Sequence, residues 1–77
     1  MFNMERKDIA IRFGALIKQL RVEKGMSQGD LAKIVGCQPQ WISHIETGKR
    51  APDLKSLVAL EKALGMNLIS ELEKGML

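Results

Sequence analysis

The chain has few of the residues that build disulfides, metal centres and membrane spans. Its 77 residues include one cysteine, one histidine, one tryptophan and no tyrosine. A single cysteine cannot form an internal disulfide, which favours a reducing, cytoplasmic location, and one cysteine with one histidine cannot complete a zinc site. No apolar run approaches the roughly 20 residues needed to cross a bilayer, and the start, MFNMERKD, lacks the apolar region of a secretory signal. We therefore expect no metal and no membrane association.

The length of the chain allows one domain with a modest core. A chain of this size buries only about 60% of its unfolded surface, which leaves no room for an enzyme cleft beside a binding surface. Residues 1–50 carry nine Lys or Arg against five Asp or Glu, whereas residues 51–77 carry three against four. This asymmetry suits a nucleic-acid face opposed to a protein-contact face, and it suits an ordinary solvated surface about as well.

Apolar spacing and capping residues predict an all-α fold of five helices. The expected helices begin at Asp8, Ser27, Gln38, Asp53 and Asn67, and the first four end at Gly25, Gly36, Gly48 and Gly65. Residues 1–7 are expected to form a loose leader, residues 8–77 a single domain, and residues 74–77 a frayed tail.

The segment 26–52 organises the rest of the chain. Ser27 and Asp30 fit a capping box at the start of one short helix. Pro39 fits the first position of the next helix, where its missing N–H is no loss. Two helices of two to three turns, joined by about three residues that include glycine, describe a helix-turn-helix, here over about 27–47.

The spaced residues of this segment closely resemble the Cro/C1-type (XRE-type) helix-turn-helix, the family of lambdoid phage repressors, restriction-modification controller proteins and many antitoxins. The residues that carry the resemblance are Met26, Ser27, Gln28, Leu31, Ala32, Gly36, Ile42, Ser43, Ile45, Glu46, Gly48, Lys49, Arg50 and Pro52. The resemblance covers about residues 13–72. It implies a five-helix lambda-repressor-like domain that binds double-stranded DNA sequence-specifically as a homodimer on a palindromic operator and regulates transcription, most often as a repressor.

The resemblance assigns base reading to the exposed side of the second helix of the pair. In similar repressors the positions of Gln38, Gln40 and His44 read bases in the major groove, where each base pair shows a distinct pattern of donors and acceptors. Gln40 and His44 are four residues apart and so share a helix face. The alternatives are an exposed helix former and a surface histidine. Pro39 replaces the hydrogen-bonding side chain of many relatives, so their operator code does not transfer.

Contacts to the DNA backbone are expected from residues around the same helix. The candidates are Arg21, Gln28, Trp41, Ser43, Thr47, Lys49 and Arg50. Gln28 lies where similar proteins aim a helix N-terminus at a phosphate. Trp41 can pack on the sugar–phosphate chain, or it can cover the junction between the two helices. Lys49 and Arg50 lie in a loop from which they can reach phosphates or the minor groove, unless that loop is a solvated turn.

Arg21 and Glu46 are expected to pair. Glu46 closes the second helix of the pair at a partly buried position, where a lone carboxylate is costly. Similar phage repressors join the matching Arg and Glu, so the resemblance implies a salt bridge between the first and third helices.

The last part of the chain, about 53–77, is expected to hold the dimer contact. The candidates are Leu68, Ile69, Leu72 and Met76, with Leu54 and Val58 as further apolar residues beyond what a small core needs. Such a surface can bury itself in a homodimer, or it can hold a toxin if the chain is an antitoxin. Some antitoxins of this family have a pairing strand after the fourth helix. Leu64, Met66 and Leu68 do alternate, but Ile69 breaks the alternation and 71–74 favours helix, so helix is predicted.

Catalysis and ligand sensing have little support in the sequence. Cys37 and His44 are the only residues that invite an enzyme interpretation, and no third group is evident to orient them. There is no ligand-sensing domain, so we expect neither a cofactor nor a small-molecule ligand. The rival to DNA binding is a protein-interaction module.

Overall fold

The computed structural model describes residues 6–76, with side chains to residue 74, and the described part contains five helices and no strand. The helices are α1 (Arg6–Glu23), α2 (Gln28–Val35), α3 (Pro39–Glu46), α4 (Leu54–Leu64) and α5 (Leu68–Met76). The all-α prediction is confirmed. The segment 64–72 forms the end of one helix and the start of another, so the choice of helix over strand is confirmed as well.

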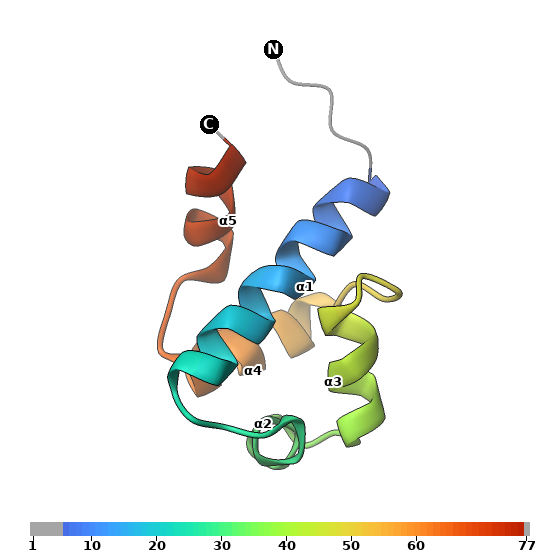
Figure 1. Cartoon of the computed structure of the whole chain (residues 1–77), viewed down its shortest axis with the longest axis vertical. Coiled ribbons are helices and arrows are strands. Elements are labelled where there is room, and N and C mark those ends of the chain that lie inside the picture. The colour runs from blue at the N-terminus through green and yellow to red at the C-terminus, as the bar shows by residue number, and fades with distance from the viewer. Residues whose placement is uncertain (1–5, 77) are drawn as a thin grey trace.

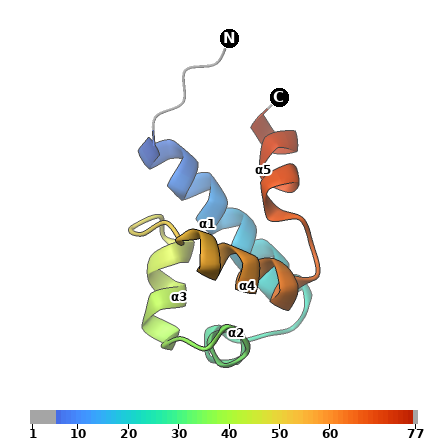
Figure 2. The same ribbon diagram turned by 180° about the vertical axis from the view of Figure 1, so that it is seen from behind.

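The helices are arranged around α1, which runs diagonally through the molecule (Figure 1). On one side α1 packs against α3, and on the other it contacts α5. The short helix α2 crosses the end of the molecule and contacts both α3 and α4. Seen from behind, α4 lies between α3 and α5 (Figure 2). One side of α3 is therefore turned away from the other helices.

The starts of α2, α4 and α5 are capped by the side chains that the sequence predicts. At α2, Ser27 Oγ accepts from the Asp30 N–H and Asp30 Oδ2 accepts from the Ser27 N–H, both at 2.9 Å. At α4, Asp53 Oδ1 accepts from the Ser56 N–H at 2.8 Å. These backbone hydrogen bonds favour the ionised carboxylates and lower the pKa values of Asp30 and Asp53. At α5, Asn67 Oδ1 accepts from Ser70 N–H at 3.1 Å.

Two boundaries differ from the prediction. The helix α1 begins at Arg6, two residues before Asp8, which lies inside the first turn. Arg6 and Lys7 are good helix formers, so the predicted leader does not extend to these two residues. Residues 1–5 lie outside the described part. The prediction of a frayed tail is also wrong for residues 74–76, which belong to α5; residue 77 lies outside the described part.

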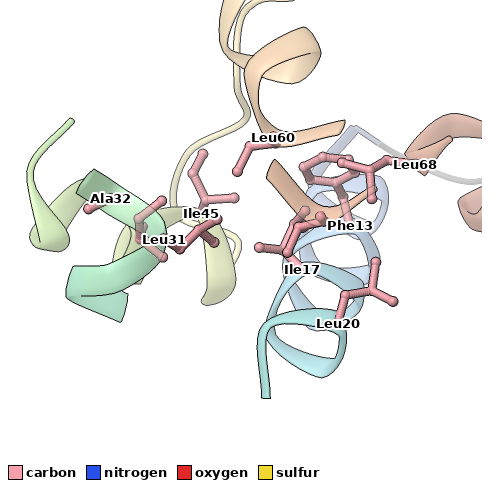
Figure 3. Packing of buried hydrophobic residues seen from close by; sticks show 10 residues of the cluster. Phe13, Ile17, Leu20, Leu31, Ala32, Ile45, Leu60 and Leu68 are labelled. Atoms are coloured by element: carbon pink, nitrogen blue, oxygen red, sulfur yellow. The ribbon is translucent and has the colours of Figure 1, made fainter. Parts of the chain in front are cut away.

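The core is built from the inward faces of all five helices. It consists of Phe13, Ile17, Leu20, Leu31, Ala32, Ile42, Ile45, Leu60, Leu64 and Leu68. Figure 3 shows Leu31 and Ile45 approaching Ile17 and Phe13 of α1, with Leu60 above them. Leu68 is completely buried in this cluster. The expectation that Leu68 lies at a dimer interface is therefore wrong, because the side chain fills the space between α5 and α1.

Glu61 of α4 links that helix to the start of α5. Glu61 Oε2 accepts a hydrogen bond from the Leu68 N–H at 3.0 Å. The first N–H groups of a helix lack partners inside that helix. Glu61 therefore supplies an acceptor to the start of α5, and it ties α5 to α4 beside the buried Leu68.

Gly14 is the point where the backbones of α1 and α3 meet. A Cβ built on Gly14 would lie 2.1 Å from Ile45 O and 2.7 Å from Glu46 O. The obstacle is backbone, which cannot rotate away as a flexible side chain could. Only glycine permits this approach of α1 to the end of α3.

Gly14→Ala is expected to destabilise the chain by about 3 kcal/mol or more, because the added methyl group forces two helices apart. Overpacking typically costs about 1–3 kcal/mol, and a clash with backbone atoms lies at or above the upper end of that range. Urea denaturation followed by circular dichroism measures the change. Gly29→Ala is the control, since a Cβ there would meet nothing closer than Ser27 Oγ at 3.6 Å; its effect should stay within about 1 kcal/mol and tend to stabilise. Equal losses for the two variants would contradict this account of Gly14.

Candidate nucleic-acid interface

The helix α3 has a buried apolar side and an outward polar side. Ile42 and Ile45 have no exposed surface. Gln38, at the N-cap, and Gln40, in the first turn, are exposed, whereas His44, one turn further, is half-buried. The three residues predicted to read bases therefore lie on the accessible side of a helix whose back is anchored in the core. Polar groups presented in this way can reach the base edges of a major groove.

The loop that follows α3 is held close to α1. Gly48 has a φ of 78°, and a Cβ there would lie 2.7 Å from Ile11 Cγ1. Both the backbone conformation and the close approach favour glycine. Lys49 and Arg50, the next two residues, are exposed, so the loop carries two cations directly after α3.

Three other candidates for backbone contacts lie on α3 or directly after it, and two of them are half-buried. Trp41 is half-buried and packs against the core, which supports its role as a cover for the helix junction and leaves part of the ring accessible. Ser43 is also half-buried. The hydroxyl of Thr47 is near two carbonyl oxygens of α3, at 3.0 Å from Ser43 O and 3.3 Å from His44 O, so its hydrogen is already used when DNA is absent.

The ion pair predicted between Arg21 and Glu46 is present. Arg21 Nε donates to Glu46 Oε2 at 2.6 Å, and Nη2 donates to Oε1 at 3.1 Å. Nη1 donates to Met26 O at 2.7 Å. Both residues are 9% exposed, and hydrogen bonding to Glu46 raises the pKa of Arg21. All three guanidinium nitrogens therefore bind groups inside the chain, and a contact of Arg21 with phosphate stays a prediction.

Gln28 joins the same carboxylate, which the sequence did not indicate. Its Nε2 donates to Glu46 Oε1 at 3.0 Å, linking the first residue of α2 to the last residue of α3. An amide nitrogen carries two hydrogens, so one N–H of Gln28 is left for a phosphate at the α2 N-terminus. No signal within the sequence predicts this bond, because it depends on the start of α2 meeting the end of α3 in the fold.

A separate apolar surface lies on α4 and α5. Leu54 is 76% exposed, Val58 43% and Ile69 44%. Beside them a groove of about 420 Å³ runs between α1 and α5, lined by Ile9, Phe13, Leu57, Ile69 and Leu72 among others. Two of the proposed dimer residues, Ile69 and Leu72, thus line one groove. The Met76 side chain lies outside the described residues.

The described residues offer little support for nucleophilic catalysis, metal binding or a membrane span. Burial raises the pKa of the Cys37 thiol, which disfavours the nucleophilic thiolate. Between residues 6 and 76, no three His, Cys, Asp or Glu side chains gather into a possible metal site. No helix in that part of the chain is both long and apolar enough to cross a membrane.

Comparisons with known proteins identify similar chains and folds. The helix-turn-helix family profile matches residues 17–70. The SPbeta prophage-derived uncharacterized HTH-type transcriptional regulator YonR of Bacillus subtilis is 40% identical over 55 residues, which cover 71% of this chain and 51% of YonR. Multiprotein-bridging factor 1c of Arabidopsis thaliana is 37% identical over 71 residues, which cover 92% of this chain and 47% of that protein. The chain thus spans about half the length of these curated relatives.

A solved structure with the same fold is the restriction-modification controller protein C.Esp1396I. It superimposes with a TM-score of 0.78 at 32% identity, covering 88% of this chain and 92% of the controller protein. A variant of C.Esp1396I bound to its highest affinity operator site OM also superimposes, with a TM-score of 0.77 at 33% identity over 86% of this chain and 91% of that one.

Glu46→Ala is expected to destabilise the fold by about 3–5 kcal/mol, because it leaves the Arg21 guanidinium buried without its counter-ion. Replacing both partners, in Arg21→Met with Glu46→Leu, should cost less than this single change, because no uncompensated charge remains. Urea denaturation of the three variants and the unmodified chain measures the difference. A double variant less stable than Glu46→Ala would show that the ion pair itself, and not relief of a buried charge, supplies the stability.

Proposed function

Because this chain belongs to the Cro/C1-type (XRE) helix-turn-helix family of DNA-binding regulators, we propose that it binds a palindromic operator as a homodimer and represses transcription from it. The observation that carries the proposal is the exposed polar side of α3, held by two isoleucines without exposed surface. The single cysteine suits a reducing cytoplasm as the place of action.

Base reading is assigned to Gln38, directly before α3, and to Gln40 and His44 on α3. Gln40 is exposed in the first turn, which is the part of a recognition helix that meets base edges. A glutamine can make a bidentate pair with adenine N6 and N7. His44, one turn on, can donate to or accept from a base edge, and Gln38 reaches the groove ahead of the helix. Pro39, between Gln38 and Gln40, offers only apolar contact, for instance with a thymine methyl group.

Backbone contacts are assigned to both ends of the helix pair. Gln28 lies at the start of α2, where unpaired N–H groups and the helix dipole attract a phosphate. At the other end, Lys49 and Arg50 follow α3 directly. Trp41, Ser43 and Thr47 lie between these ends on or beside α3. Contacts with phosphates set the register of the protein on the duplex, and they supply much of its affinity.

The homodimer is assigned to the apolar surface of α4 and α5. Leu54 and Val58 are one helical turn apart and share a face, and both are exposed. Ile69 and Leu72 line the neighbouring groove. Covering such an apolar surface in a dimer removes it from water, which is favourable. A twofold contact would also present two recognition helices about one turn of DNA apart. Met76, at the end of α5, completes the proposed contact.

The same apolar surface favours one second candidate function. A groove of about 420 Å³ with mainly apolar lining can accept a segment of another protein as well as a second copy of this chain. In that case the chain would act as an antitoxin that holds a toxin. The two functions are compatible, since binding a partner through α4 and α5 leaves α3 free for DNA.

Gln40→Ala and His44→Ala are each expected to reduce the preference between operator sequences by about 1–3 kcal/mol, because a base contact is lost. Lys49→Ala should instead weaken binding to all sequences alike and make its salt dependence shallower. Selection from a randomised duplex library, followed by titrations at several salt concentrations, measures both effects. Identical profiles for Gln40→Ala and Lys49→Ala would contradict this division of roles.

Ile69→Glu is expected to shift the chain from dimer to monomer, because it places a charge in the proposed contact. Ile34→Glu is the control: Ile34 is 61% exposed and belongs to α2, so its substitution should leave the dimer intact. Sedimentation velocity over a range of protein concentrations measures the equilibrium. A monomeric unmodified chain, or equal behaviour of the two variants, would rule out this interface.

A further inference from the structure

A second charged surface lies beyond the recognition helix. Arg6 and Lys7 of α1, together with Lys49 and Arg50 of the loop after α3, line one open depression of about 450 Å³. The loop lies alongside the N-terminal half of α1 (Figure 1). We call these four residues the α1–loop cluster. Its two halves are more than forty positions apart in the sequence, so neither could be assigned to the other from the sequence alone.

The four cations of the α1–loop cluster have no partner in the part of the chain that the structure describes. None of the four takes part in the side-chain ion pairs seen there, such as Arg21 with Glu46 and Lys74 with Glu71. The side chains of the α1–loop cluster also make no hydrogen bond to another described residue. All four residues are exposed, so their charges face solvent around one hollow.

This arrangement works against the stability of the free chain. Arg6 and Lys7 lie in the first turn of α1, where the helix dipole is positive and disfavours cations. Asp8 is the only acidic residue of that turn. Lys49 and Arg50 add two like charges around the same depression. A bound anion would relieve both the mutual repulsion and the unfavourable interaction with the helix dipole.

We infer that the α1–loop cluster binds phosphates of the operator backbone, so that the DNA contact continues past the loop to the start of α1. This inference rests on the proposed function. The loop follows directly from α3, so a strand bordering the groove that holds α3 passes Lys49 and Arg50. Arg6 and Lys7 line the same depression and meet the next phosphates of that strand. They read no base, because they act as charges on a backbone that is the same in every sequence.

The test is the double variant Arg6→Ala with Lys7→Ala, titrated by fluorescence anisotropy against a mixed-sequence duplex at several salt concentrations. Two lost phosphate contacts should make the slope of log affinity against log salt shallower by about 2. Affinity should fall alike for unrelated sequences. The melting temperature should stay equal or rise, since the substitutions remove cations from a helix N-terminus.

The matched control removes the same charge elsewhere. Lys62→Ala with Lys74→Ala takes two exposed cations from α4 and α5, and neither residue lines the depression of the α1–loop cluster. Its salt slope should match that of the unmodified chain, which separates a local contact from an effect of net charge.

Three outcomes would overturn the inference. The slope could be unchanged in Arg6→Ala with Lys7→Ala, it could shift equally in the control, or weaker binding could come with a lower melting temperature. These outcomes leave the proposed function standing if the unmodified chain binds the duplex. Failure of the unmodified chain to bind duplex DNA even at low salt would instead overturn the proposed function, and this inference with it.

Discussion

The position of the recognition helix depends on one buried carboxylate. Glu46 is the last residue of α3, and it accepts hydrogen bonds from Arg21 of α1 and from Gln28 of α2. The three helices closest to the proposed DNA surface are thus joined at a single group. Because Glu46 and Arg21 are nearly excluded from solvent, moving α3 would leave charges buried without partners, which is costly. The ion pair therefore holds the angle of α3 more firmly than apolar contact alone.

The close approach at Gly14 makes this ion pair geometrically possible. The backbone of α1 passes directly over the carbonyl groups of Ile45 and Glu46, so the end of α3 is brought against α1. Arg21 lies two turns further along α1, within reach of the Glu46 side chain. A larger residue at position 14 would separate the helices and lengthen the hydrogen bonds of the guanidinium. Steric and electrostatic constraints thus act on the same few residues of α3, and disturbing either affects the surface that carries Gln40 and His44.

The sequence predicted best those features that depend on neighbouring residues. The caps at Ser27, Asp53 and Asn67 need only groups three residues away, and each is formed as expected. The Arg21–Glu46 pair, 25 positions apart, was predicted only through resemblance to a family. The contacts of Gly14 with α3, of Gln28 with Glu46 and of Glu61 with Leu68 were missed, because they depend on which distant segments meet in the fold. Leu68 was misplaced for the same reason, since periodicity shows that a face is apolar without showing what covers it.

The two proposed surfaces meet at Arg6, and this has a consequence for binding. Arg6 lines both the apolar groove and the α1–loop cluster. A second copy seated in the groove would therefore bring two sets of unpaired cations near each other, which opposes dimerisation in the absence of DNA. Phosphates bound to both sets would remove that repulsion. Because such coupling is reciprocal, DNA would favour the dimer by the same factor as dimerisation favours DNA binding. Charge placed beside an apolar contact can in this way make a small regulator assemble chiefly where its operator is.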